Sequence, residues 1–293
     1  MFRTSSRDAR WEPTGRTIVP NERDEPLSVD FRFLATAIEA VVRAGEMQMA
    51  RFGSDLRVDK KGAIDLVTEV DVEVERMFRA LIAERFPDHD VLAEEMGQPR
   101  TGATHRWVFD PLDGTTNYAH GVPIFCSALA LEIEGQPVVA AVFDPNRREL
   151  FTAERGVGAW MNGQPLRVSA SDTLNDSVLV TGFPYDVRER MDETLNLFAD
   201  FLRVARAVRR LGSAAIDLCW VAAGRLDGFW EQGLQSWDTM AGALIVQEAG
   251  GRVTALDGSA WDPHGGRVLA SNGHIHEAMV NVIANVRTSG QSA

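Results

Sequence analysis

Two aspartates stand three residues apart in the segment WVFDPLDGTTN, directly after a short apolar run. A strand over residues 107–109 would bring Asp110 to its end, where Pro111 stops the ladder because proline has no amide hydrogen. Asp113 follows within one turn of chain, so both carboxylates can point to one place. Residues 114–116 then present backbone N–H groups in a concavity suited to an anion.

Carboxylates beside an anion site repel the anion unless a divalent cation lies between them. Mg²⁺ prefers hard oxygen ligands, usually keeps several of its waters and bridges carboxylates to phosphate groups. The segment thus indicates magnesium-dependent phosphate chemistry. A turn in which the two aspartates only cap the backbone is the alternative that this segment alone leaves open.

Three further acidic segments have ordinary explanations when each is taken alone. Glu94 and Glu95 follow the apolar pair Val91-Leu92 and would be tolerated in a solvated loop. Asp71 and Asp238 each stand at the start of a predicted helix, where aspartate is a common capping residue. The presence of all four acidic segments in one chain, in this order, has no such ordinary explanation.

Predicted helices and strands must position these side chains. Helical spacing of apolar residues predicts helices over 31–52, 71–86, 193–202, 213–223, 238–249 and 273–286. Short apolar runs predict strands over 107–109, 125–133, 138–143, 150–153, 158–161, 178–182, 204–209, 227–231, 252–255 and 268–271. Helices, then a mostly antiparallel sheet, then alternating helices and strands indicate a layered α/β (α+β) fold.

One folded domain is expected after a polar N-terminal segment. Residues 1–28 contain three prolines and no periodic pattern, which predicts a flexible arm. Residues 29–293 are long enough for a large core. They are expected to form two subdomains, of about 29–170 on the metal and phosphate side and about 171–293 on the substrate side.

Composition and charge argue against several classes of function. The formal net charge is −12, from 30 basic and 42 acidic residues, so the chain is a poor general nucleic-acid binder. No apolar run reaches membrane-spanning length, and the N-terminus lacks the apolar core of a secretory signal. We expect a cytoplasmic protein with no membrane partner, in which Cys126 and Cys219 are buried free thiols.

Together, the four acidic segments resemble those of the inositol monophosphatase family of metal-dependent, lithium-sensitive phosphatases. The resemblance covers nearly all of residues 30–290 and rests on WVFDPLDGTTNYAHG and WDTMAGALIVQEAGG, with DLVTEVD and AEEMG before them. It implies an α-β-α-β-α sandwich of the inositol monophosphatase and fructose-1,6-bisphosphatase type. It also implies a homodimer.

The resemblance further implies a site for two or three Mg²⁺ ions. Glu94, Asp110 and the backbone carbonyl of Leu112 would bind one ion. A second ion would be bound by Asp110, Asp113 and Asp238. A third, weaker ion would be held through Glu94 by way of water.

Catalytic and substrate-binding roles follow from the same resemblance. Asp71 would pair with Thr115 to orient the attacking water, with Glu94 and Glu95 in support. Lys60 is a candidate for a basic residue near the site. The substrate would be bound by Asp113, Gly114, Thr115, Ala214, Glu231 and Asp238.

The expected reaction is hydrolysis of a small phosphate monoester, with myo-inositol monophosphate as the leading substrate, giving inositol and phosphate. Positioning and charge neutralisation lower the barrier to such a reaction, so no serine, cysteine or histidine nucleophile is needed. Fructose 1,6-bisphosphate, histidinol phosphate and 3′-phosphoadenosine 5′-phosphate are alternative substrates. An interaction protein that binds the transcription machinery, as some bacterial family members do, is the alternative from another class.

Overall fold

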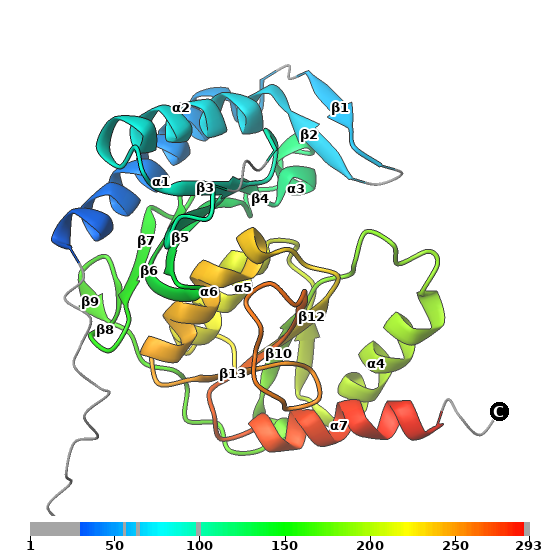
Figure 1. Cartoon of the computed structure of the whole chain (residues 1–293). Coiled ribbons are helices and arrows are strands. Elements are labelled where there is room, and N and C mark those ends of the chain that lie inside the picture. Colours follow the sequence, from blue (N-terminus) through cyan, green and yellow to red (C-terminus); the bar gives the residue numbers. More distant parts are fainter. Residues whose placement is uncertain (1–29, 55–56, 63–64, 98–100, 290–293) are drawn as a thin grey trace, which may run out of the picture.

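The computed structural model describes residues 30–54, 57–62, 65–97 and 101–289. The arm predicted over residues 1–28 lies outside the described residues. Within them, helices and sheets alternate in five layers (Figure 1). The predicted α-β-α-β-α sandwich is confirmed.

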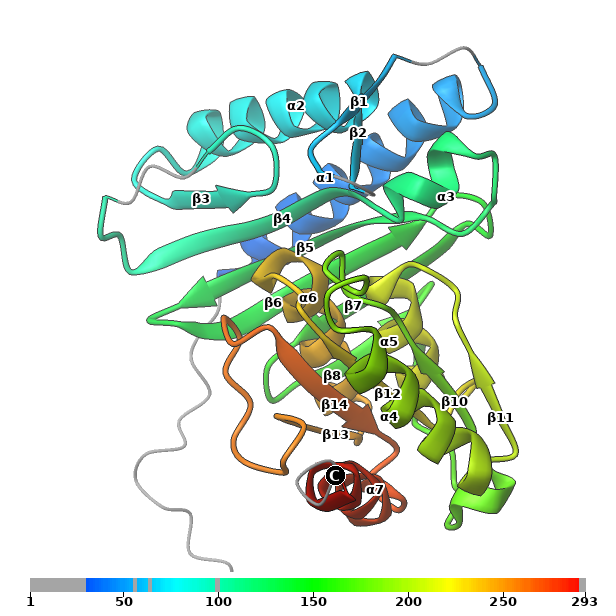
Figure 2. The ribbon, with the colours of Figure 1, turned by 90° about the vertical axis from the view of Figure 1, so that its right-hand side faces the viewer.

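Three pairs of helices form the helical layers, and two sheets lie between them (Figures 1 and 2). The outer pair beside the larger sheet is α1 (Phe31–Arg51) and α2 (Glu69–Arg85). The middle pair is α5 (Ala214–Ala222) and α6 (Ser236–Glu248). The far pair is α4 (Met191–Val204) and α7 (His276–Ser289).

The larger sheet has seven strands in the order β3-β4-β5-β6-β7-β8-β9, and only the β3–β4 pair is parallel. Its strands are β3 (Asp90–Ala93), β4 (His105–Asp113), β5 (Cys126–Ile133), β6 (Gln136–Asp144), β7 (Glu149–Glu154), β8 (Gly158–Met161) and β9 (Gln164–Pro165). The Asn162-Gly163 turn joins β8 to β9. Strand β4 extends well beyond the predicted 107–109, and α3 (Thr115–Ala119), which was not predicted, follows it closely.

The smaller sheet has five strands in the order β11-β10-β12-β14-β13. Its strands are β10 (Val178–Thr181), β11 (Ala207–Arg209), β12 (Gly228–Gln232), β13 (Arg252–Thr254) and β14 (Arg267–Ser271). Strand β10 runs parallel to both neighbours, whereas β14 is antiparallel to β12 and β13. A short 3₁₀ helix, η1 (Leu174–Asp176), precedes β10.

Two further short strands form a separate hairpin that the sequence pattern did not predict. Strands β1 (Val58–Lys60) and β2 (Leu66–Thr68) pair antiparallel, and β2 leads directly into α2. The residues of β1 are exposed, so no alternation of apolar and polar side chains marks this strand.

The middle layer sets the position of the candidate site. Helices α5 and α6 are apolar on nearly all sides, which is typical of helices buried between two sheets. They pack closely because Gly242 has no side chain: a Cβ atom there would lie 2.6 Å from the Cβ of Leu218. This contact helps to fix the first turns of both helices, which carry residues of the site.

Candidate active site

A β-bulge shapes the acidic segment at the end of β4. Asp110 and Asp113 both pair with β5, but two residues of β4 stand opposite one residue of β5 between them. Pro111 lies in this bulge, so the expectation that it ends the strand is wrong: the ladder skips the proline and resumes. The Gln48 side-chain amide donates to the Pro111 carbonyl at 2.8 Å and to the Ser127 hydroxyl at 2.8 Å, which holds the bulge in place.

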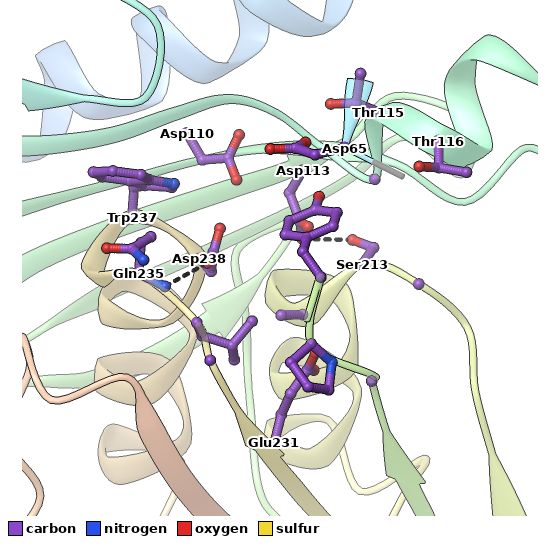
Figure 3. A pocket seen from close by; sticks show the side chains of 18 of the residues that line it. Asp65, Asp110, Asp113, Thr115, Thr116, Ser213, Glu231, Gln235, Trp237 and Asp238 are labelled. Atoms are coloured by element: carbon purple, nitrogen blue, oxygen red, sulfur yellow. Dashed lines mark hydrogen bonds between the residues drawn. The ribbon is translucent and has the colours of Figure 1, made fainter. Parts of the chain in front are cut away.

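The carboxylates of Asp110 and Asp238 are each held by one backbone amide. Asp110 Oδ1 accepts from the amide of Leu112 at 2.9 Å. Asp238 Oδ2 accepts from the amide of Gln235 at 2.6 Å, at the start of α6. In both residues the second oxygen is left for another partner, and Figure 3 shows the two side chains turned toward the same space.

Asp113 is anchored to the first turn of α5 (Figure 3). Its Oδ2 accepts from the Ser213 hydroxyl at 2.6 Å and from the Ala215 amide at 2.8 Å. These bonds fix the carboxylate and leave Oδ1 for a ligand. Helix α5 of the middle layer therefore orients Asp113, which lies on β4 of the larger sheet.

A cavity of about 380 Å³ lies between the two sheets and contains most of the predicted site. Its lining includes Glu94, Asp110, Leu112, Asp113, Gly114, Thr115, Ala214, Glu231 and Asp238. Four segments that are far apart in the chain thus meet at one cavity.

Burial and mutual repulsion raise the proton affinity of these acids. Burial, followed by the charges of Glu94, Asp113 and Asp238, raises the pKa of Asp110 well above its usual range. The pKa of Asp113 and that of Asp238 are also raised, with burial as the main cause. The acids therefore share a space in which the protein compensates only part of the negative charge.

Lys61 and Arg210 are the basic residues in the lining of this cavity, and Lys60 is not part of it. Lys61 Nζ lies 2.7 Å from Glu94 Oε1 and 2.5 Å from Glu95 Oε1. Lys60, the candidate from the resemblance, is exposed in β1 and does not line the cavity. The one-residue difference arises because Lys60 ends β1, whereas Lys61 starts the following turn.

Both glutamates hold protons more strongly than usual. Burial, opposed mainly by the charge of Lys61, raises the pKa of Glu94 to about 7. Burial likewise raises the pKa of Glu95 to about 7. Glu95 itself does not line the cavity, but its side chain contacts the same lysine.

Glu75 positions this glutamate pair from helix α2. Its side chain is fully buried and accepts from the Glu95 amide at 2.7 Å and the Met96 amide at 3.1 Å. Arg79 donates to Glu75 at 2.7 Å and holds it in turn. An acid within the apolar face of α2 is the sequence signal that would have identified Glu75.

Asp71 and Thr115 meet at the edge of the cavity, as the resemblance implies. The Thr115 hydroxyl lies 3.1 Å from Asp71 Oδ1 and 2.8 Å from the Leu112 carbonyl, and it donates to one of them at a time. Asp71 also accepts from the Thr68 amide at 2.8 Å in the capping box of α2. This explains how one aspartate can both cap a helix and contact the site.

Asp65 and Ser213 are site residues to which sequence reasoning gave no role. Asp65 lines the cavity, and its buried Oδ1 has no hydrogen-bond partner within the described residues. Ser213 anchors Asp113, as described above. Asp65 lies within the DLVTEVD segment, but only the fold shows that it turns into the cavity (Figure 3).

The donor set fits a hard divalent cation. Carboxylates and a backbone carbonyl are oxygen donors of the kind that Mg²⁺ prefers. Among the described residues, no group of three or more acidic, histidine or cysteine side chains is arranged to hold a metal ion by itself. The carboxylates instead line an open cavity, which suits an ion that keeps several waters.

Solved structures with this fold define its class. A structure of the inositol monophosphatase of Anabaena (Nostoc) has a TM-score of 0.80 at 40% identity, covering 87% of this chain and 96% of that one. A crystal structure of an IMPase/NADP phosphatase complexed with Mg²⁺ and phosphate has a TM-score of 0.73 at 27% identity, covering 82% and 90%. The fold is that of the inositol monophosphatases.

Sequence comparison gives the family. The model of the inositol monophosphatase family matches residues 31–289. The inositol-1-monophosphatase of Synechocystis sp. is 45% identical over 254 residues, which is 86% of this chain and 88% of that protein. The Nus factor SuhB of Pseudomonas aeruginosa is 42% identical over 257 residues, or 85% and 95%. This chain belongs to the inositol monophosphatase family and is thereby a phosphatase.

Among the described residues, no helix is both long and apolar enough to cross a membrane. Both cysteines are buried and free, as predicted.

Proposed function

We propose that this protein hydrolyses a small phosphate monoester with the help of Mg²⁺, and that myo-inositol monophosphate is its preferred substrate. One observation carries the proposal. Three aspartates of the cavity, Asp110, Asp113 and Asp238, each use one carboxylate oxygen for the protein's own amides and hydroxyls, and each leaves the other oxygen for a ligand. A carboxylate that is held by one oxygen and has the other oxygen free suits cation binding, and the free oxygen gives the fold itself no benefit.

Five residues would hold the metal ions: Glu94, Asp110, Asp113, Asp238 and, through its carbonyl, Leu112. Bound Mg²⁺ would neutralise charge, activate a water and stabilise the leaving oxygen. Two or three ions offset four carboxylates and a substrate phosphate that carries up to two negative charges. Glu94 pairs with Lys61 in this structure, so it must release Lys61 before it can bind a metal ion.

The remaining groups position the water and the phosphate. Asp71 and Thr115 would orient the attacking water, since a Thr115 hydroxyl that donates to Asp71 or to the Leu112 carbonyl keeps its lone pairs free to accept from that water. The backbone amides of Gly114 and Thr115, at the start of α3, would hold the phosphate oxygens. Gly114 has a φ of 93°, in the left-handed region that favours glycine.

The alcohol part of the substrate would face the smaller sheet. Glu231 projects from β12 into the cavity, and Ala214 begins α5 beside it. Burial, opposed mainly by Arg210, raises the pKa of Glu231 to about 8. A volume of about 380 Å³ suits a small sugar-like alcohol together with its phosphate.

The first experiment replaces one proposed metal ligand. The variant Asp110→Asn keeps the size of the side chain but removes a charge, so Mg²⁺-dependent phosphate release should fall at least about a hundredfold. Phosphate release from about ten monoesters, compared by kcat/KM, identifies the preferred substrate. Retained turnover in a folded Asp110→Asn protein would contradict the proposal.

Asp144→Asn serves as the control for Asp110→Asn. Asp144 is also fully buried, but it accepts from the Asn146 amide at 2.9 Å and from Arg147 at 2.8 Å, away from the cavity. Its loss should lower the melting temperature and leave kcat/KM unchanged. The pair of variants thus separates folding from catalysis.

A second candidate function is binding to the transcription machinery, favoured by the similarity to the Nus factor SuhB. A pull-down of transcription complexes with wild-type protein and with Asp110→Asn tests it. A partner retained by both proteins would support an interaction role that does not depend on catalysis. Homodimer formation, inhibition by lithium and a cytoplasmic location remain predictions from the family resemblance.

A further inference from the structure

Gln48 is a polar side chain on the buried face of α1 that the mechanism above does not use. It is fully buried, and most other residues of that face are apolar. Within the described residues, its Oε1 has no hydrogen-bond partner. Burying an amide that is only partly satisfied costs free energy, so an apolar side chain of similar length would suit the packing of α1 equally well or better.

The amide nitrogen of Gln48 is directed at the bulge in β4. Nε2 donates to the Pro111 carbonyl at 2.8 Å and to the Ser127 hydroxyl at 2.8 Å, and the Cys126 carbonyl lies 3.4 Å from it. The Ser127 hydroxyl in turn donates to the Pro111 carbonyl at 3.0 Å. Two side chains, one from α1 and one from β5, therefore donate to a single carbonyl oxygen.

The peptide group between Pro111 and Leu112 transmits this contact to the site. A peptide group is planar, so the direction of its carbonyl fixes the direction of its N–H. The Leu112 N–H donates to Asp110 Oδ1 at 2.9 Å. Holding the Pro111 carbonyl therefore sets where the second oxygen of Asp110 points. The same peptide group places Leu112, whose own carbonyl is a proposed metal ligand.

Gln48 also connects α1 to α3. Its backbone carbonyl accepts from the Tyr118 hydroxyl at 2.7 Å, and Tyr118 is buried. Helix α3 begins at Thr115, whose amide is proposed to hold the phosphate. One turn of α1 thus contacts both the bulge that carries the acids and the helix on the phosphate side.

We propose that Gln48 and Ser127 are positioning residues of the metal site, which act through the peptide group of Pro111 and Leu112 and set the affinity of the protein for Mg²⁺. Neither side chain lines the cavity, so neither is placed to bind an ion itself. This role rests on the proposed function. Replacing a group that is hydrogen-bonded to a metal ligand typically weakens metal binding by about 10- to 100-fold.

Gln48→Met and Ser127→Ala remove the two donors separately. Methionine has a length similar to that of glutamine but no N–H group, so it fills the same space in α1. In each variant, Kd for Mg²⁺ should rise about tenfold, measured by calorimetric titration of the metal into the substrate-free protein. The Mg²⁺ concentration for half-maximal phosphate release should rise in parallel, because the same ions support the reaction.

Melting temperatures in EDTA separate positioning from a structural role. Gln48→Met should melt within about 3 °C of the wild-type protein, because a partly satisfied buried amide adds little net stability. Ser127→Thr keeps the hydroxyl donor, so its Kd for Mg²⁺ should stay within about threefold of wild type. Its extra methyl group in a packed core should lower the melting temperature.

Thr36→Val is the control variant on the same helix. Thr36 is 1% exposed and accepts from Arg85 at 3.2 Å, and it does not line the cavity. Valine has nearly the same shape, so this variant removes a polar group from the buried face of α1 without touching the bulge. Its Kd for Mg²⁺ should equal that of the wild-type protein.

Unchanged Mg²⁺ affinity in Gln48→Met and Ser127→Ala would overturn the proposed role, and so would equal weakening in Thr36→Val. Ser127→Ala leaves α1 intact and decides the question if Gln48→Met does not fold. Failure of the proposed function gives a different result: the wild-type protein itself would then bind no Mg²⁺ in the titration.

Discussion

Lys61 shows how single residues balance charge at this site. Its ammonium group lies between Glu94 and Glu95, with 25% of its side chain exposed. Burial alone would lower its pKa, but the two carboxylates outweigh burial and raise it. The lysine therefore compensates part of the negative charge that bound cations would otherwise neutralise.

Replacing Lys61 should make stability depend more strongly on magnesium. In Lys61→Met the two glutamates lose their shared partner, so the free energy of unfolding in EDTA should fall by about 1 to 3 kcal/mol. With saturating Mg²⁺ the loss should be smaller, because cations replace the missing charge. Thermal denaturation with EDTA and with Mg²⁺ measures both effects.

Lys60→Met is the matched control for this experiment. Lys60 is exposed in β1 and does not line the cavity, so its removal should leave both melting temperatures unchanged. Equal effects of the two substitutions would contradict the role described for Lys61.

At the scale of elements, the joint between β4 and α3 sets the position of the amides that are proposed to bind phosphate. Gly114 forms this joint with a φ of 93°. A Cβ atom there would lie 2.8 Å from the Ile124 carbonyl oxygen and 3.3 Å from the Gly212 carbonyl oxygen. Both the backbone conformation and the available space therefore require glycine.

Gly114→Ala should reduce stability and activity together. Strain at a left-handed φ and the close carbonyl contacts should lower the free energy of unfolding by about 1 to 3 kcal/mol. Moving the amides of residues 114 and 115 should also lower kcat/KM about tenfold or more. Denaturation and steady-state kinetics measure the two losses.

Gly135→Ala separates conformational strain from crowding. Gly135 has a similar φ of 78°, but a Cβ atom there would meet nothing within 4 Å. This variant should lose less stability and keep its activity. Equal kinetic losses in both variants would show that the position of Gly114 has no special importance.

Much of the fold, but less of the local geometry, could be predicted from the sequence. Apolar periodicity identified the six long helices and most strands, because burial on one face leaves a clear pattern. The β1–β2 hairpin was missed, since its exposed residues carry no such pattern. The bulge at Pro111 was missed because it depends on Gln48, more than sixty positions away.

The site could be predicted where a residue type and its spacing carry the chemistry. The aspartates at 110, 113 and 238 converge as expected, because hard ligands are recognisable in the sequence. Glu75 acts through burial and hydrogen bonding in the folded chain, which a sequence pattern does not display. Lys60 was predicted in place of its neighbour Lys61, because a sequence pattern does not display which of the two lysines contacts the cavity.

For the whole molecule, the cavity acids make stability depend on pH and metal. Without metal, Glu94 and Glu95 have pKa values of about 7 and Glu231 of about 8, compared with an ordinary value of 4.5. In the unfolded chain these groups lose their protons at lower pH than in the folded protein. Their contribution is therefore fully present below about pH 4.5 and is lost as pH rises through about 7 to 8.

The melting temperature in EDTA should accordingly fall as the pH is raised from 5 to 8. Within that pH window, each carboxyl group that keeps its proton only in the folded state lowers the free energy of unfolding by about 1.4 kcal/mol per pH unit as the pH rises. Mg²⁺ should restore stability most at pH 8, because cations favour the ionised carboxylates. A melting temperature that rises over this range in EDTA would contradict the assignment of raised pKa values.

The residues that line the cavity come from two different parts of the fold. Acids that would hold the cations come mainly from the seven-stranded sheet and the segment after β3, whereas Glu231, proposed to face the alcohol, comes from the five-stranded sheet. On the proposed function, substitutions on the second half would change which alcohol is accepted while the acids of the first half stay in place. Such a division allows descendants of one ancestral enzyme to acquire new substrates without first losing the ability to cleave phosphate.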